Sequence, residues 1–175
     1  MKNKAPVATA LALTLVLGAI GNPAYADLRI SEFEGHIVFC APQNPPVIVE
    51  ELPGGVEIVT FVNIGNIWLT GNPLVDGIEE NRAVVTFVPD SPITTVKIKG
   101  KIDVAAVDGR WRFRQRIILG PDGDSGIGLG LGSGDLRGKL LLFQTGTPEL
   151  IENSPCEVPI GAPLTGKIIS FGWIA

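Results

Sequence analysis

VKIKGKIDV at residues 96–104 and WRFRQRI at 111–117 are two alternating runs that flank Asp108-Gly109. Apolar and polar residues that alternate with period 2 predict β-strands. Asp-Gly between two such runs is the strongest short-range hairpin signal, because a type I′ turn needs positive φ at both central residues. The sequence therefore predicts a two-residue turn at Asp108-Gly109, in which Val107 faces Arg110.

This register assigns the hairpin side chains to two faces. The pairs expected on the apolar face are Val104 with Phe113, Ala106 with Trp111 and Ile98 with Leu119. On the opposite face Asp103 is expected to meet Arg114, and Lys101 to meet Arg116. One face should therefore belong to the core, while the other forms a basic face made of Lys97, Lys99, Lys101, Arg112, Arg114 and Arg116.

The rest of the chain also has strand character, with Gly and Pro between short apolar runs. We expect strands at 29–39, 47–50, 56–64, 67–70, 82–88, 139–145 and 164–174, a polar loop over 71–81 and a Pro-rich loop over 147–163. The glycine-rich segment 120–138 has neither a phosphate-loop motif nor a complete calcium loop, so we expect a bend or a flattened strand there. With no sustained helical period, the sequence predicts an all-β fold: a single antiparallel barrel of about eight strands, or alternatively a β-sandwich.

The N-terminus resembles a secretory signal peptide. Lys2 and Lys4 precede an apolar run over residues 7–20, and Ala24-Tyr25-Ala26 is an A-x-A cleavage site. We expect residues 1–26 to be removed and residues 27–175 to form one secreted or periplasmic β-barrel domain without a transmembrane segment. A retained anchor is the alternative. A transmembrane barrel is disfavoured because the mature chain has no tyrosine for interfacial girdles.

Charge is unevenly distributed along the chain. The full sequence carries a net charge of −4, and loss of Lys2 and Lys4 leaves 12 basic against 18 acidic residues, or −6. Seven of these basic residues lie between Lys97 and Arg116, where only Asp103 and Asp108 oppose them. An acidic protein with one basic segment does not fit a general nucleic-acid binder, so no nucleic-acid partner is expected.

Cys40 and Cys156 are the two cysteines, and in an exported protein an even count favours a disulfide. Two buried free thiols are the alternative. Neither cysteine has another Cys or a His at ligand spacing. Glu32, Glu34 and His36 fit a solvent-facing polar row better than a metal site. We therefore expect no metal and no cofactor.

The stretch 112–119, followed by GLGSGDLRG at 130–138, resembles the strand, G-x-G-x-[FL]-x-G, strand pattern of dirigent and allene oxide cyclase-like barrels. The resemblance implies an exported eight-stranded barrel with an apolar cavity, of the kind that holds or cyclises hydrophobic intermediates. This chain departs from the pattern by inserting residues 121–128, and no catalytic residue of that family can be placed in it.

Two classes of function follow from these features. The first is a non-enzymatic exported barrel that binds a small apolar ligand or, through the basic face, a polyanionic surface or partner, including a second copy of the chain. The second is a cofactor-free isomerase or cyclase that acts on an apolar substrate in the lumen. That second class needs a polar group inside the barrel, for which the sequence offers Glu57, Asn63 and Gln115 on otherwise apolar strand faces.

Processing provides the first test. The intact mass of the exported protein should match a chain that starts at Asp27, because cleavage follows the A-x-A site. A mass that includes residues 1–26 would contradict the assigned compartment.

Overall fold

The computed structural model describes residues 27–40, 47–152, 154–156 and 159–172, so the predicted signal peptide lies outside the described residues. Within these ranges the chain forms strands and connecting turns. The strands are β1 (Asp27–Phe39), β2 (Val47–Leu52), β3 (Val56–Leu69), β4 (Gly77–Phe87), β5 (Thr94–Val104), β6 (Gly109–Leu119), β7 (Ser125–Gly134), β8 (Lys139–Thr145), β9 (Glu149–Leu150) and β10 (Ile160–Gly172). No helix in the described part of the chain is long and apolar enough to cross a bilayer.

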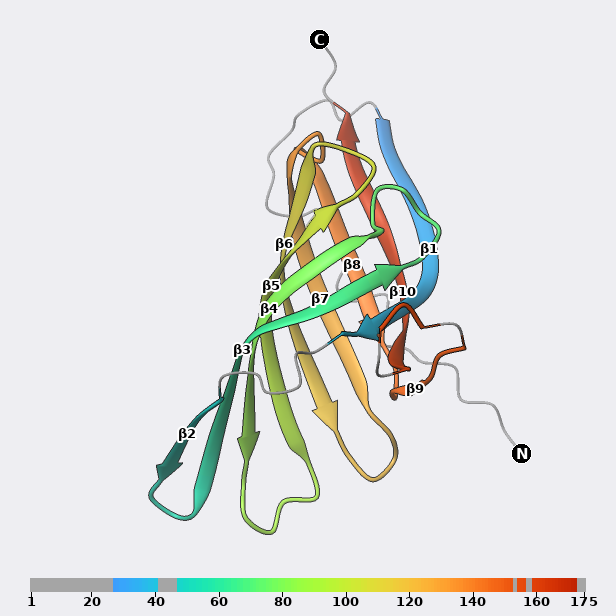
Figure 1. Cartoon of the computed structure of the whole chain (residues 1–175). Coiled ribbons are helices and arrows are strands. Elements are labelled where there is room, and N and C mark those ends of the chain that lie inside the picture. Colours follow the sequence, from blue (N-terminus) through green and yellow to red (C-terminus); the bar gives the residue numbers. More distant parts are fainter. Residues whose placement is uncertain (1–26, 41–46, 153, 157–158, 173–175) are drawn as a thin grey trace, which may run out of the picture.

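The strands described in these ranges close into an eight-stranded antiparallel barrel (Figure 1). Its order is β1-β10-β8-β7-β6-β5-β4-β3, and β3 pairs back with β1 to complete the ring. The predicted barrel is therefore confirmed, and the sandwich alternative is wrong. All neighbouring strands that lie consecutively between β3 and β8 are connected as hairpins, which keeps the contacts between them local.

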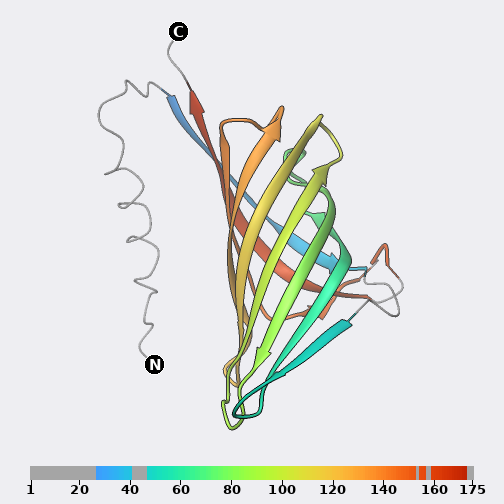
Figure 2. The same ribbon diagram turned by 90° about the vertical axis from the view of Figure 1, so that its left-hand side faces the viewer.

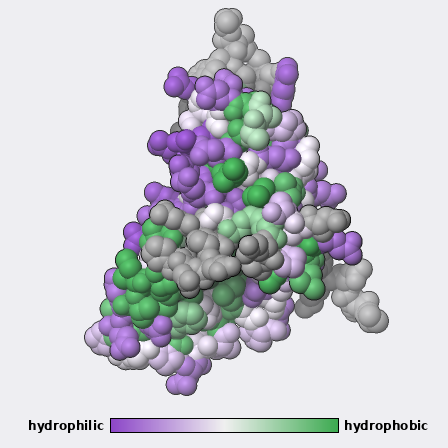
Figure 3. Space-filling model, viewed as in Figure 1, coloured by the Kyte–Doolittle hydropathy of each residue, from purple (hydrophilic) through white to green (hydrophobic). Residues whose placement is uncertain are grey.

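Two short strands lie outside the ring. β2 pairs with β3, and β9 pairs with β10. Figure 2 shows β2 standing beside the lower end of the barrel. Hydrophobic residues gather in this region (Figure 3), among them the exposed Val47, Ile48 and Val49. The sequence predicted a short edge strand at 47–50, and β2 confirms it.

The predicted boundaries differ from the structure around β3 and β4. β3 runs without interruption from Val56 to Leu69, although the sequence predicted two strands separated at Gly65-Asn66. The irregularity lies instead at Val62–Ile64, where the register against β4 shifts. A bulge bends a strand without ending it. Because this longer β3 offers more pairing partners, β4 begins at Gly77, inside the segment predicted as a loop.

The central hairpin forms, but its register differs from the prediction by four residues along β5. Gly100 lies opposite Phe113, where Val104 was expected, and the last pair is Asp103 with Arg110. Neither Asp108 nor Gly109 has the positive φ of a type I′ turn. The backbone N–H and C=O of Asp108 instead bond to Asp135 in the β7–β8 turn, so the hairpin ends in a longer loop.

An even shift preserves the faces, because side chains alternate with period 2. Ile98, Ile102 and Val104 of β5 therefore point inward as predicted, and so do Trp111 and Phe113 of β6. Ala106 is the exception, since it lies exposed in the loop and does not face Trp111. The pairs predicted for Ile98, Asp103 and Lys101 are also wrong: these residues lie opposite Gln115, Arg110 and Arg112.

The glycine-rich segment is the regular strand β7. Its even-numbered glycines point into the barrel, and a Cβ on Gly128 would overlap the ring of Phe143. That ring packs edge-on against Trp68, at 4.9 Å between centroids, and against Phe113, at 5.7 Å. The missing side chains of β7 are thus the reason that three aromatic rings fit inside the barrel.

The predicted disulfide joins Cys40 and Cys156, whose Cα atoms are 5.2 Å apart. It links the end of β1 to the segment before β10, across a sequence separation of 116 residues. Disulfides of this kind are typical of proteins that fold in an oxidising compartment.

Removal of this bridge should destabilise the protein strongly. The double variant Cys40→Ser/Cys156→Ser is expected to lose about 4 kcal/mol of unfolding free energy, because the unfolded chain regains the entropy of a long loop. Urea denaturation measures the difference. The parent, unfolded without reductant, should show no free thiol on titration, and two titratable thiols would refute the bridge in solution.

Candidate functional site

The basic face lies on the outer surface of β5 and β6, as predicted. The observed register places Lys97 opposite Arg116, Lys99 opposite Arg114 and Lys101 opposite Arg112. The predicted register gave one such like-charged pair, whereas the structure has three in succession. Like charges directly opposite each other on neighbouring strands are destabilising. The arrangement is therefore more unfavourable for the isolated protein than the sequence indicated.

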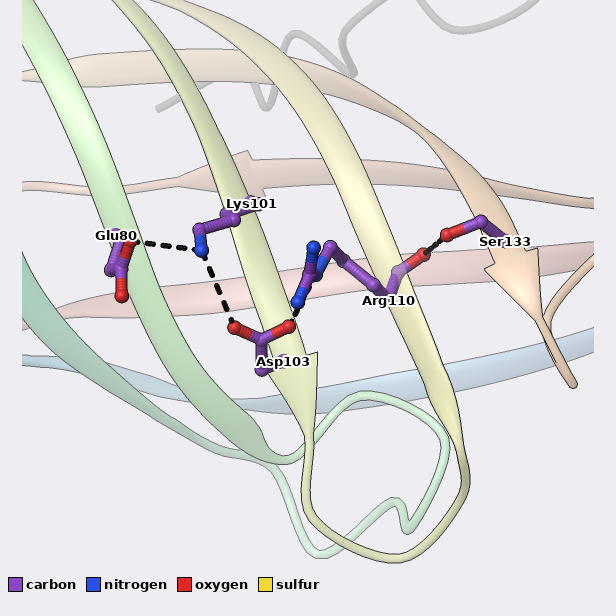
Figure 4. A network of polar contacts seen from close by, with 5 residues as sticks. All are labelled: Glu80, Lys101, Asp103, Arg110 and Ser133. Carbon is purple, nitrogen blue, oxygen red and sulfur yellow. Dashed lines mark hydrogen bonds and ion pairs between the residues drawn. The ribbon is translucent and has the colours of Figure 1, made fainter.

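Acidic partners are confined to one end of this face (Figure 4). Lys101 Nζ lies 3.0 Å from Glu80 Oε2 and 3.7 Å from Asp103 Oδ2, and Asp103 also pairs with Arg110. The carbonyl of Arg110 accepts a hydrogen bond from the Ser133 hydroxyl at 3.1 Å. This network holds Lys101 and Arg110, but in the described structure it does not extend to the other cations of the face.

Arg82 of β4 is a further member of the face that was not predicted. It lies opposite Lys99, so that Arg82, Lys99 and Arg114 form one transverse row of cations across three strands. None of the three has an ion-pair partner among the described residues. The turn at Pro89–Pro92 lies midway between Arg82 and Lys99. A hairpin centred on this turn would have revealed the row from the sequence.

The row crosses a shallow depression of about 370 Å³ on the outer surface. Its rim carries Glu80, Arg82, Lys99, Lys101, Arg112 and Arg114, and Gly100 lies at its base. Five cationic side chains around one depression, with a single acid already paired to Lys101, suit an anionic group better than any other ligand.

A second candidate site, made of polar side chains, lies inside the barrel. Gln115 is buried and donates a hydrogen bond from Nε2 to Thr145 Oγ1 at 2.8 Å, beside a cavity of about 80 Å³. Of the other predicted lumen residues, Glu57 is half-buried at the start of β3 and does not line this cavity. The side chain of Asn63 lies outside the described residues.

Glu79 is the buried carboxyl of the lumen, and it is only 2 % exposed. Trp68 Nε1 donates to its Oε2 at 2.5 Å, and Asn81 Nδ2 donates to its Oε1. Burial raises the pKa of Glu79, although hydrogen bonds from Trp68, Asn81 and Asn66 oppose that rise. The amide oxygens of Asn66 and Asn81 are buried and have no partner in the described structure.

The sequence did not single out Glu79 because it lies in GIEENRA, where both strand faces are polar. That pattern suggested a loop. The alternation becomes visible only further along β4, at Ala83 and Val85, which are the inward residues of the same strand. Extending their period backwards would have placed Asn81 and Glu79 on the inner face.

Two members of the polar row of β1, His36 and Glu32, contact side chains of other strands. His36 Nε2 lies 3.0 Å from Glu149 Oε1, and Lys167 Nζ lies 2.7 Å from Glu32 Oε1. In the described ranges no group of three His, Cys, Asp or Glu side chains is close enough to hold a metal ion.

Comparison with known proteins places the chain in no established family. No protein-family model, curated protein or solved structure matches it. The assignment of function therefore depends on the geometry of the two sites.

The buried carboxyl predicts a specific dependence of stability on pH. Because the pKa of Glu79 is raised above its ordinary value of 4.5, the folded state retains this proton to higher pH than the unfolded state. This contribution to stability is complete below pH 4.5 and is lost as the pH rises through the folded-state pKa. Glu79→Gln should remove the loss, so its advantage over the parent should grow with pH in chemical denaturation.

Glu34→Gln, which removes an exposed carboxyl of β1, is the matched control for the loss of one carboxyl group from the chain. A constant difference for Glu79→Gln would contradict the raised pKa.

Proposed function

We propose that this protein is an exported, non-enzymatic binding protein whose basic face attaches it to an anionic partner. The observation that carries the proposal is the transverse row of Arg82, Lys99 and Arg114, with like-charged pairs on either side of it. Each such pair opposes folding by roughly 0.2–1 kcal/mol. A bound anion relieves that repulsion, and its attraction to the same cations contributes to the free energy of binding.

The distribution of charge supports this role. The mature chain is acidic, and seven of its 12 basic residues lie on two adjacent strands, β5 and β6. A concentrated positive field on an otherwise negative protein attracts an anionic partner to one side and repels it elsewhere, which fixes the orientation of binding.

The size of the lumen favours this class over an isomerase or cyclase. Pockets for small organic ligands typically measure about 300–1,000 Å³. The cavity beside Glu79 and Gln115 measures about 80 Å³, and the aromatic rings of Trp68, Phe113 and Phe143 are packed together in the buried core of the barrel. A buried acid in a barrel is the one feature that favours proton-transfer chemistry, and this alternative would need the lumen to open for its substrate.

Export is supported by the signal-like N-terminus and by the disulfide. Membership of the dirigent and allene oxide cyclase-like barrels stays a proposal. The eight-stranded barrel agrees with it, but one fold serves many unrelated functions.

Retention on an anionic polymer column tests the proposal. The exported protein should bind at low salt and elute as salt screens the charges. The variant Lys99→Glu/Arg114→Glu should flow through or elute at much lower salt, because it reverses two charges at the centre of the face.

The control Arg137→Glu/Lys139→Glu makes the same change in net charge outside the basic face and should elute close to the parent. Equal retention of parent and Lys99→Glu/Arg114→Glu would show that the face is only a solvated surface.

A further inference from the structure

An apolar row lies directly beside the basic face. It consists of Ile127, Leu129 and Leu131, the outward residues of β7, which are 65 %, 48 % and 62 % exposed. Strand pairing places Ile127 opposite Arg116, Leu129 opposite Arg114 and Leu131 opposite Arg112. The next strand continues the apolar character, since Leu142 pairs with Leu129 and Leu140 with Leu131.

The outer surface of four adjacent strands is therefore divided lengthwise. Reading across β5, β6, β7 and β8, the central row is Lys99, Arg114, Leu129, Leu142, and its neighbour is Lys101, Arg112, Leu131, Leu140. Cations occupy one half and aliphatic side chains the other, with the boundary between β6 and β7.

The fold gives no reason for the apolar row to be where it is. In a sheet with one solvated face, apolar side chains normally point to the core. β7 does the reverse, because its inward positions are glycines and its aliphatic side chains all point outward. These side chains contribute nothing to the lumen packing, so their exposure indicates contact with a partner.

We propose that this divided face docks on the surface of an anionic lipid bilayer. The inference rests on the proposed function of the basic face and names its partner. A bilayer surface offers phosphate groups and, just below them, acyl chains, so that it can satisfy cations and apolar side chains that lie side by side. A soluble polyanion offers only charge and would leave Ile127, Leu129 and Leu131 in water.

The lengths of the side chains suit this geometry. Arg112, Arg114 and Arg116 can extend along the surface to reach phosphates while their stems remain beside the apolar row. Leu129 and Leu131 are shorter and branched, and they enter the boundary between headgroups and acyl chains. The barrel would then rest with the β6–β7 boundary against the membrane.

Vesicle flotation tests the docking. The exported, disulfide-bonded protein should float with vesicles of phosphatidylcholine and phosphatidylglycerol at low salt, and should not float with phosphatidylcholine alone. The variant Ile127→Thr/Leu129→Thr/Leu131→Thr places β-branched threonine, which favours strands, at all three positions, so it should fold as the parent does. It should bind the anionic vesicles at least about tenfold more weakly, because it loses the apolar contact. Its retention on the anionic polymer column should not change.

The control Ile48→Thr/Leu150→Thr removes two exposed aliphatic side chains from β2 and β9, outside this face, and should bind vesicles like the parent. Unchanged vesicle binding by the β7 variant would overturn lipid docking and leave anion binding in place. A sedimentation coefficient that falls from the parent to this variant would show that the apolar row joins two copies of the chain, and would also overturn lipid docking. A parent that binds neither vesicles nor column would overturn both proposals. Equal far-UV circular dichroism of parent and variants verifies that the comparison is between folded proteins.

Discussion

Closure of the barrel depends on a short seam between β1 and β3. Only His36–Phe39 of β1 pairs with Asn66–Leu69 of β3 in the described structure. The same seam orients Trp68, whose ring enters the aromatic core while its Nε1 holds Glu79. The chain leaves the seam at Cys40, where the backbone N–H donates to the carbonyl of Gly65 and the side chain forms the disulfide. The same few residues therefore close the ring, pack the core and hold the buried carboxyl. The Cys40–Cys156 disulfide lies at the end of this seam.

The sequence predicted the strand face on which a side chain lies much better than the residue that pairs with it on the neighbouring strand. The alternation of β5 and β6 placed six cations outside correctly, because an even error in register leaves every side chain on its own face. The partners were wrong because the Asp108 backbone bonds to Asp135, 27 residues further along the chain, and a local turn rule takes no account of such a contact. Glu79 was missed for a related reason: the segment around it is polar on both faces, and pairing with β3 on one side and β5 on the other makes that segment a strand.

The lumen and the basic face differ in how far the protein itself offsets the electrostatic cost of their charged groups. Inside the barrel, Trp68 and Asn81 donate hydrogen bonds to the Glu79 carboxyl, so the cost of burying this group is offset within the protein. On the outside, the cations of β5 and β6 face one another with acids at one end only, so in the described structure most of their repulsion is not offset within the protein. The buried acid therefore has its hydrogen-bond partners within the protein, whereas most cations of the exposed basic face have no ion-pair partner among the described residues.

The inward glycines of β7 also make the interior of this barrel easy to modify in evolution. Gly128 and Gly130 leave the inner side of the strand bare, and Phe143 occupies the space beside Gly128. The ring of Phe143 therefore fills one part of the lumen, next to the rings of Trp68 and Phe113. A descendant with a small residue at position 143 would acquire a cavity beside Gly128, while its outer surface stayed as it is. The packing of the lumen and the character of the outer surface can thus evolve independently in the same chain.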